Sequence, residues 1–295
     1  MYNQKHTRFA IPFVFAVTLF ISACSAPTPA LKADPTAIAT ELPLPGAMTI
    51  SKEPCSPQTV NVFAAASLTE AFKEMAPLFQ AEESCAELVF NFAGSQKLSQ
   101  QILDGAPADV FASASDNNME EVKSAGLISG PGSQIFARNG LAVVVCPKTN
   151  FTIETVKDLA QPGIKLVVAA REVPVGDYTN QFLEKAAADP QLGQAFVDAF
   201  GANEVSFEAD VRSVLAKVDI CEGDAGIVYS SDAFTDKSEG IKSFLIPEAL
   251  NVNAKYPIAG IKVSANPGLA QKFIDFVLSD QGQQILEDNG FLKAK

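Results

Sequence analysis

Residues 60–69 read VNVFAAASLT, and they join two different patterns of apolar residues. The first half, residues 60–64, is a short apolar run typical of a strand that is buried on both faces. Apolar residues then recur at helical spacing, at Leu68, Phe72, Met75, Ala76 and Phe79. A buried strand that leads directly into an amphipathic helix is the repeating unit of α/β proteins with parallel sheets.

The same alternation continues along the chain on the carboxyl side of this segment. Further strands are predicted at residues 87–92, 109–112, 141–145, 165–169, 205–207, 226–229 and 256–262. Helices are predicted to begin at Ser95 and Asp116 and to cover 176–187, 191–200, 210–217, 267–278 and 280–289. Residues 138–140 (Arg-Asn-Gly) are predicted to be a polar break. The pattern predicts an α/β fold in which helices cover both faces of mostly parallel sheets, with no internal repeat and no membrane span in the globular body.

The composition excludes several classes of function. The chain has 295 residues and a formal charge of −12, and its one histidine is His6. Catalysis by Ser-His-Asp or Cys-His groups needs an imidazole, and catalytic zinc sites usually take at least one histidine ligand. An acidic surface repels phosphate backbones, so nucleic acid is not expected as a partner. With 47 % hydrophobic residues the chain can build a large core.

Residues 1–23 have the features of an export signal. A short basic region with Lys5 and Arg8 precedes the uncharged run 9–21, which is too short for a stable membrane-spanning helix. The following Ile21-Ser22-Ala23-Cys24 resembles the lipobox of bacterial lipoproteins, which implies cleavage before Cys24 and lipidation of that cysteine. The alternative is an ordinary signal that is cleaved elsewhere. Removal of the signal removes His6 and leaves a mature chain with a charge of −14.

Residues 24–57 are expected to tether the globular body to the lipid anchor. The stretch 25–57 contains 7 of the 18 prolines and no aromatic residue, as is typical of extended, semi-rigid spacers. Cys55 lies near its end and precedes the first predicted strand, whereas Cys85 precedes the second. Neighbouring parallel strands would bring both cysteines to one edge of the sheet, so their pairing is feasible in an oxidising compartment. Free buried thiols remain the alternative.

Two serines lie at the junctions between a strand and a helix, where α/β proteins bind ligands. Ser67 follows the first predicted strand and Ser95 follows the second, each next to alanine or glycine. The carboxyl ends of parallel strands lie side by side, and helix N-termini there offer unpaired N–H groups to an anion. The alternative is that both serines only cap their helices. The sequence contains no nucleophile elbow, no phosphate-binding loop and no EF-hand.

Later segments contain similar features. Val173-Pro174-Val175-Gly176 and Asp210-Val211-Arg212 each open a predicted helix, and Tyr229 ends a predicted strand. The two helix starts could direct N–H groups at the same ligand, and Tyr229 could add its hydroxyl. A tyrosine that only packs in the core is the alternative for Tyr229.

These segments, taken together, resemble the molybdate-binding proteins of bacterial ABC importers. The motifs that carry the resemblance are VFAAASLT at 62–69, FAGS at 92–95, GAPADVF at 105–111, VPVG at 173–176, DVR at 210–212, GIVYSSD at 226–232, YPIA at 256–259 and NGF at 289–291. They follow one another in the order and spacing of the family from about residue 59 to the end of the chain.

The resemblance implies the two-lobed periplasmic-binding-protein fold of type II, in which two hinge crossings join the lobes. The lobes would be residues 58–139 plus 256–295 and residues 140–255. It also implies that molybdate or tungstate binds in the cleft through the hydroxyls of Ser67, Ser95 and Tyr229 and the backbone N–H groups of Val175 and Val211, with no cofactor and with molybdenum bound only as the oxyanion. The family places the strand 141–145 antiparallel to its neighbours, which would bring Cys146 to Cys221 as a second disulfide.

The resemblance further implies a partner and a location. The protein would be a monomer without catalytic activity, held on the outer face of a membrane, and it would deliver its ligand to a permease dimer driven by a cytoplasmic ATPase. Ala170-Arg171 stands where the family often has an acidic residue followed by proline, and Arg171 could shift the selectivity. The alternatives are a protein that binds another oxyanion such as sulfate, a binding protein for an organic anion, an enzyme on a similar fold, and a surface lipoprotein that serves as a sensor or adhesin.

Overall fold

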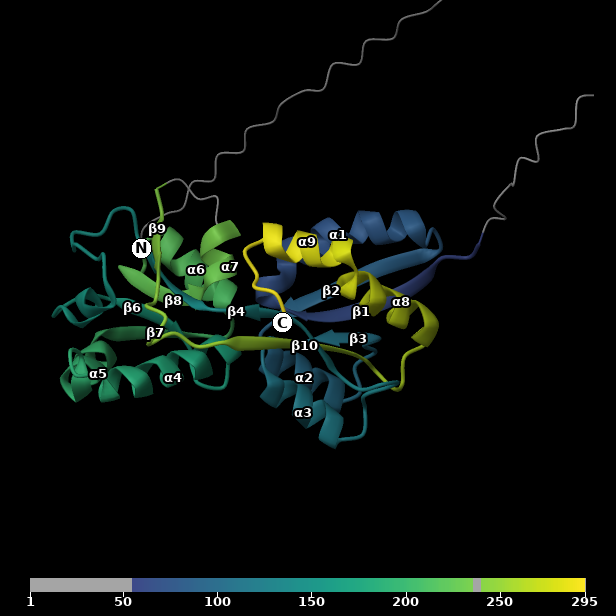
Figure 1. The fold of residues 1–295 in the computed structure, drawn as a ribbon, viewed down its shortest axis with the longest axis horizontal. Coiled ribbons are helices and arrows are strands. Elements are labelled where there is room, and N and C mark those ends of the chain that lie inside the picture. Colours follow the sequence, from purple (N-terminus) through teal and green to yellow (C-terminus); the bar gives the residue numbers. More distant parts are fainter. Residues whose placement is uncertain (1–54, 236–239, 295) are drawn as a thin grey trace, which may run out of the picture. The chain divides into compact units, whose positions relative to one another are not determined.

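The computed structural model describes residues 55–235 and 240–294. The expected signal, Cys24 and the tether up to residue 54 lie outside the described residues. The described part contains two five-stranded sheets, each flanked by helices (Figure 1). No helix among the described residues has the length and apolar character that a membrane span requires. We call each sheet with its helices a lobe.

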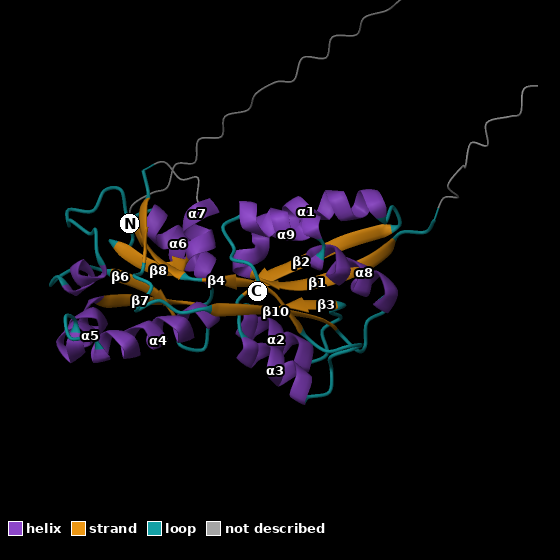
Figure 2. Ribbon diagram, in the orientation of Figure 1, coloured by secondary structure: helices purple, strands orange, loops and turns teal. Residues whose placement is uncertain are grey.

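The first lobe has the strand order β2-β1-β3-β10-β4. Its strands are β1 (Gln58–Ala65), β2 (Ala86–Ala93), β3 (Val110–Ala112), β4 (Gln134–Asn139) and β10 (Ala254–Gly260). Its helices are η1 (Ala66–Leu68), α1 (Thr69–Glu82), α2 (Ser95–Leu103), α3 (Asp116–Ser124), α8 (Pro267–Leu278) and α9 (Asp280–Asp288). Helices α1, α8 and α9 cover one face of the sheet, and α2 and α3 cover the other (Figure 2).

The second lobe has the strand order β7-β6-β8-β5-β9. Its strands are β5 (Leu141–Val145), β6 (Leu166–Ala169), β7 (Glu204–Glu208), β8 (Ala225–Tyr229) and β9 (Lys242–Leu245). Its helices are η2 (Val156–Ala160), α4 (Pro174–Ala188), α5 (Gly193–Asn203), α6 (Val211–Asp219) and α7 (Ser230–Thr235). Helices α4 and α5 lie on one face of this sheet, and α6 and α7 lie on the other (Figure 2).

The two sheets share one topology although the sequence shows no internal repeat. In each sheet three neighbouring strands run parallel, the next strand runs against them, and the last strand runs against that one. The reversed strands are β10 and β5, so the sheets are mixed. The two-lobed α/β fold expected from the sequence is confirmed, as is the antiparallel direction of 141–145.

Two strands were missed, and one predicted break is wrong. Strand β4 extends to Asn139, so the polar residues 138 and 139 continue the sheet instead of interrupting it. The Asn139 side chain is fully buried and forms hydrogen bonds, and the Arg138 Nε donates to Ala294 O. Strand β9 was missed because three of its four residues are exposed, which leaves little apolar pattern to detect.

The core fills both faces of the first sheet and continues into the second lobe. Phe72 on α1 packs against Phe90, Phe136 and Phe273 with ring centroids 5.6–6.2 Å apart. A separate cluster around Leu98, Phe111 and Met119 lies under α2 and α3. Burial of aromatic rings of this size provides much of the hydrophobic stabilisation of a domain.

Two disulfides link segments that are distant in the sequence. The structure joins Cys55 to Cys85 and Cys146 to Cys221, which are the two pairings that the sequence analysis favoured. The first connects the end of the tether segment to the turn before β2, and Gln58 pairs with Ala86 at the start of the parallel ladder. The second links the end of β5 to the turn after α6 in the second lobe.

Candidate functional site

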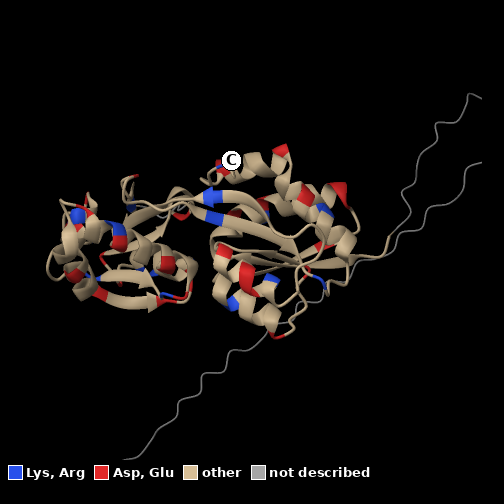
Figure 3. Ribbon diagram, turned by 60° about the horizontal axis from the view of Figure 1, so that its bottom comes forward, with Lys and Arg blue, Asp and Glu red and all other residues tan. Residues whose placement is uncertain are grey.

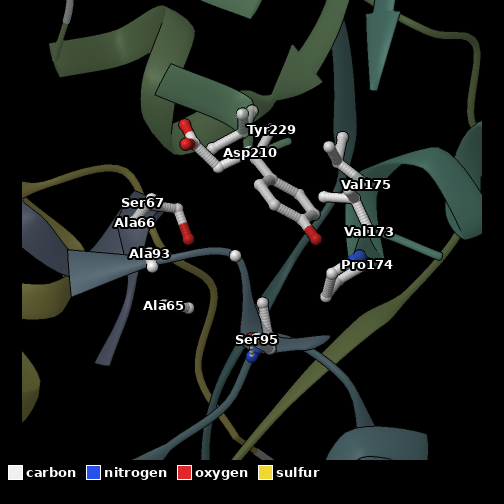
Figure 4. Close-up of a pocket in the computed structure, with 13 residues that line it drawn as sticks. Ala65, Ala66, Ser67, Ala93, Ser95, Val173, Pro174, Val175, Asp210 and Tyr229 are labelled. Atoms are coloured by element: carbon white, nitrogen blue, oxygen red, sulfur yellow. Dashed lines mark hydrogen bonds between the residues drawn. The ribbon is translucent and has the colours of Figure 1, made fainter. Parts of the chain in front are cut away.

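A small cavity lies where the two lobes face each other, and the expected binding residues line it. The empty space among the lining residues is about 210 Å³, including the part that is open to solvent. The lining residues are Ala65, Ala66, Ser67, Ala93, Gly94, Ser95, Ala114, Val173, Pro174, Val175, Asp210, Val211 and Tyr229. The structure thus brings together all five predicted ligand residues, from both lobes (Figure 4).

The two serines of the first lobe are buried, and neither caps a helix. The N-cap of η1 is Ala65 and that of α2 is Gly94, and neither helix start has a capping bond from a side chain. The Ser67 Oγ instead lies 2.9 Å from a tyrosine hydroxyl, that of Tyr256. The Ser95 Oγ accepts a hydrogen bond of 2.9 Å from the Ala114 N–H. Simple N-capping therefore does not explain either serine.

The second lobe presents two helix starts to the cavity. Val175 is the second residue of α4, and Val211 is the first residue of α6. The first N–H groups of a helix have no partner within the helix, and they carry partial positive charge. Gly176 lets α4 begin close to β6, because a Cβ atom there would meet the Ala170 carbonyl oxygen at 2.0 Å. Both valine side chains are apolar, so the backbone N–H is the part of each residue that could donate to a ligand.

Tyr229 provides the third hydroxyl of the cavity. It ends β8, it is 2 % exposed, and its hydroxyl has no hydrogen-bond partner among the described residues. Figure 4 shows this hydroxyl and that of Ser67 pointing toward the same space. Burial raises the pKa of Tyr229 well above its usual value, so the hydroxyl keeps its proton at neutral pH. A buried hydroxyl without a partner is costly, and a ligand that accepts its hydrogen bond would offset that cost.

Charged side chains contribute little to the lining of the cavity. Asp210 is the one charged lining residue, and its carboxylate caps α6 by accepting hydrogen bonds from the N–H and hydroxyl of Ser213. Arg171, which could shift the selectivity, is exposed and does not line the cavity. Burial raises the pKa of Glu204, and the charge of Arg171 lowers it. The acidic residues that give the chain its negative net charge are spread over helices and loops of both lobes (Figure 3).

The lobes also contact each other directly beside the cavity. Gln96 Nε2 at the start of α2 donates to the Ala209 carbonyl oxygen at 2.9 Å. Gly94 permits this approach, because a Cβ atom there would lie 2.6 Å from the same oxygen. Position 94 in the motif at 92–95 therefore needs a glycine for a steric reason, because a loop from the other lobe passes close to it.

A second interlobe contact is centred on Arg212 at the start of α6. Its guanidinium pairs with Glu70 of α1, and its Nε also lies 3.4 Å from the Ala66 carbonyl oxygen. The same Nε lies 3.1 Å from Asp232 Oδ1, as an ion pair whose angle does not make a hydrogen bond. Arg212 belongs to a motif noted in the sequence, but its partners are 142 and 146 residues away along the chain and could not be found by spacing.

The groups that lie behind the serines were not identified from the sequence as part of the site. Tyr256 is fully buried in β10 and contacts Ser67, and Asn139 at the end of β4 donates to the same tyrosine oxygen at 3.4 Å. The YPIA motif marked the position of Tyr256 but not its role. The register of β10 against β4 brings Asn139 close to Tyr256, and sequence periodicity does not specify that register.

The donor set determines which ligands this cavity can hold. Three neutral hydroxyls and the backbone N–H groups of four helix starts surround the space, and the one lining carboxylate is engaged elsewhere. Such a set suits a small anion that only accepts hydrogen bonds. Among the described residues, neither lining serine forms a hydrogen bond with a carboxylate.

Comparison with known proteins supports the resemblance noted in the sequence. The model of a family described as bacterial extracellular solute-binding protein matches residues 60–292. The molybdate-binding protein ModA of Mycobacterium tuberculosis is 37 % identical over 238 residues, which cover 80 % of this chain and 85 % of that protein. ModA of Escherichia coli is 34 % identical over 240 residues, covering 79 % and 88 %.

A solved structure confirms the fold independently. The periplasmic molybdate-binding protein of Azotobacter vinelandii superposes with a TM-score of 0.68 at 19 % identity, over 79 % of this chain and 98 % of that one. Members of the matched family are extracellular, and the relatives named here are binding proteins. The matched residues, the identity to two ModA proteins and the shared two-lobed fold show that this chain belongs to the bacterial extracellular solute-binding proteins, in the family of the molybdate-binding proteins.

Proposed function

We propose that this chain captures molybdate or tungstate outside the cytoplasm and delivers it to an ABC importer. The ion would lie in the cavity between the lobes, bound by the hydroxyls of Ser67, Ser95 and Tyr229 and by the N–H groups of Val175 and Val211. The N–H groups of both serines would add further donors. The observation that carries the proposal is the buried Tyr229 hydroxyl, which has no partner among the described residues and faces a cavity lined by hydrogen-bond donors.

The chemistry of the ion matches this donor set. Molybdate and tungstate at neutral pH are dianions without a proton, so every oxygen accepts. Phosphate usually carries a proton and needs an acceptor, but Asp210, the one lining carboxylate, is occupied by Ser213. Sulfate is also an acceptor without a proton, and it is smaller, so the size of the cavity must separate it from molybdate.

Closure of the two lobes around the ion is part of the proposal. The lobes would be residues 58–139 plus 256–295 and residues 140–255, and they would move about the two chain crossings that connect them. The contacts of Gln96 and Arg212 across the cleft support this assignment, because they join the lobes beside the cavity. Closure excludes water, and this strengthens each hydrogen bond to the ion.

The remaining parts of the proposal concern location and partners. Cys24 would carry the lipid that holds the mature protein on the outer face of a membrane, with residues 24–57 as the tether. A permease dimer with a cytoplasmic ATPase would receive the ion from the monomeric protein. We propose no cofactor and no catalytic reaction.

Calorimetric titration of the purified protein with molybdate, tungstate, sulfate and phosphate tests the ligand. Tight binding of molybdate and tungstate, with weaker binding of the other two ions, is the expected result. Tightest binding of sulfate would make this a sulfate-binding protein, which is the alternative from the sequence. Failure to bind any of the four ions would contradict the assignment of the cavity.

The substitution Tyr229→Phe tests the residue that carries the proposal. Loss of a hydrogen bond to a charged group should weaken molybdate binding by roughly tenfold or more. The ligand-free protein should be as stable as the wild type or more stable, because the substitution removes a buried hydroxyl that lacks a partner. If thermal unfolding shows a clear loss of stability together with unchanged affinity, then Tyr229 is only a core residue.

A further inference from the structure

A line of buried polar groups runs from the strands that connect the lobes to the Ser67 hydroxyl. Asn139 is the last residue of β4, and it lies opposite Ala254 in the ladder with β10. Its Nδ2 lies 3.4 Å from the Tyr256 Oη, which in turn lies 2.9 Å from the Ser67 Oγ. All three polar side chains are buried, so water does not compete for these bonds.

The backbone determines which end of the Asn139 amide faces Tyr256. The N–H groups of Gly140 and Ser231 lie 3.1 and 3.3 Å from one amide atom, and the Ser230 Oγ lies 2.7 Å from it. Because a backbone N–H can only donate, that atom must be the oxygen. The other amide atom is therefore the nitrogen, and it can only donate a hydrogen bond to Tyr256.

The hydrogen bond donated by Asn139 determines which of Tyr256 and Ser67 donates to the other. A phenol hydroxyl has one proton, and the lone pair of Tyr256 that faces Asn139 receives a hydrogen bond. The Tyr256 hydroxyl has two hydrogen bonds among the described residues, and since the one with Asn139 uses a lone pair, the one with the Ser67 Oγ is left for its proton. Burial raises the pKa of Tyr256 well above its usual value, so this proton stays in place. Ser67 accepts it, and its own proton remains free for the cavity.

The hydroxyl of the second serine, Ser95, also accepts a hydrogen bond, but from a different kind of group. The Ser95 Oγ accepts the Ala114 N–H at 2.9 Å, so its proton is also left for the cavity. One serine is oriented by a backbone N–H, which a substitution removes only if it introduces proline. The other is oriented by a tyrosine, which a substitution can change, and this difference makes the role of Tyr256 testable.

We propose that Tyr256 and Asn139 are positioning residues that make Ser67 a donor to the bound ion and thereby set the selectivity against anions that carry a proton. The inference rests on the proposed function of the cavity. An anion such as hydrogen phosphate brings its own O–H, and a serine whose lone pair is already occupied cannot accept it. The line of hydrogen bonds therefore discriminates by the direction of the bonds, in addition to any discrimination by size.

The substitution Tyr256→Phe tests the proposal with two ions in mildly alkaline buffer. There both ions are dianions, and only phosphate carries a proton. Molybdate affinity is measured by calorimetry and phosphate affinity by competition. Freed from Tyr256, Ser67 can rotate and accept, so molybdate should bind about tenfold more weakly and the ratio of molybdate to phosphate affinity should fall by about tenfold. An unchanged ratio would overturn the proposal, because damage to packing weakens both ions alike.

A double-mutant cycle with Ser67→Ala separates a positioning role from a general one. If Tyr256 acts through Ser67, then Tyr256→Phe in the Ser67→Ala background should change molybdate affinity by less than about twofold. Independent, additive losses would contradict the inference. Tyr178→Phe is the matched control: it removes a hydroxyl from a ring that packs 6.3 Å from Tyr229 but lies outside the line, and it should leave both affinities unchanged.

A second variant covers the case in which Tyr256→Phe does not fold. Asn139→Asp keeps the shape of the side chain and turns the group that faces Tyr256 into an acceptor, so Tyr256 would donate to it and Ser67 would turn away from the ion. The added charge acts equally on two dianions, so the affinity ratio again isolates the direction of the bonds and should fall. If the wild-type protein binds neither ion, the proposed function fails; if it binds molybdate but both variants keep the wild-type ratio, only this inference fails.

Discussion

Both lobes place helix starts at one cavity, but the donors that we propose for the ion are of different kinds in the two lobes. The proposed donors of the first lobe are the side-chain hydroxyls of Ser67 and Ser95, whereas those of the second are the backbone N–H groups of Val175 and Val211 and the hydroxyl of Tyr229. On the first side we therefore expect side chains to determine the affinity for the ion, because an alanine there would remove a donor. On the second side the backbone conformation matters more, and the valine side chains can change without loss of a donor.

The lobes also differ in how they bury a carboxylate. Asp109 of the first lobe accepts hydrogen bonds from the backbone and side chain of Asn61, from Ser264 and from Ala265. Asp232 of the second lobe is fully buried and accepts no hydrogen bond among the described residues, and the guanidinium of Arg212 lies beside it. The first carboxylate is a satisfied part of the core, and the second is a source of pH dependence next to the interlobe contact.

Removal of both first-lobe hydroxyls should have the largest effect. Each hydrogen bond to a charged ion contributes about 1.5–3 kcal/mol, so Ser67→Ala with Ser95→Ala should weaken molybdate binding by about a hundredfold or more. Calorimetry of the single and double variants measures the loss. Ser95→Ala should also lower the thermal stability, because the Ala114 N–H loses its buried acceptor. A double variant that binds like the wild type would remove the first lobe from the site.

The buried carboxylate of the second lobe predicts a stability that depends on pH. Burial raises the pKa of Asp232 to about 6, although Arg212 lowers it. The folded protein therefore binds this proton more tightly than the unfolded chain does. The resulting stabilisation is fully present below about pH 4 and is lost as the pH rises through about 6, and it is on the order of 3 kcal/mol.

Asp232→Asn should remove this part of the pH dependence. Denaturant unfolding gives the free energy of unfolding of the wild type and the variant between about pH 4 and pH 7. The contribution of Asp232 is the difference between the two curves. A variant with the same slope as the wild type would show that another group titrates in this range.

A backbone donor of the second lobe can be removed with little change to the fold. Val211 is the first residue of α6, where proline is tolerated, and the preceding Asp210 is already extended. Val211→Pro should weaken molybdate binding by about tenfold or more, because it removes one N–H. Val211→Ala keeps the N–H and should bind within about threefold of the wild type. Equal losses in both variants would show that the valine side chain, and not its backbone, is what matters.

The ion pair between the lobes should have the smallest effect. Glu70 and Arg212 are 42 % and 26 % exposed, and exposed pairs contribute about 0.2–1 kcal/mol. Glu70→Gln should therefore lower molybdate affinity by less than about fivefold, and the difference should shrink in high salt. A larger loss that persists in high salt would mean that the pair, rather than the ion, holds the lobes together.

The order of strands and helices could be predicted because each has a strong local pattern. The apolar run 60–64 and the helical spacing from Leu68 to Phe79 both correspond to observed elements, β1 and α1. Strand β4 could not be found from its polar end, because Asn139 is buried through hydrogen bonds to Ser230 and Ser231 on another element. A residue with such distant partners looks like a surface residue in any local window.

The sequence by itself determined the alternation of strand and helix, and it identified Ser67, Ser95 and Tyr229 as candidate ligands. Local residue spacing specifies those features, because a strand or helix start depends on neighbours within a few positions. Only the tertiary structure decided what the hydroxyls do. Whether a serine donates or accepts depends on the atom behind it, and for Ser67 that atom belongs to a residue 189 positions away, which the sheet register places there.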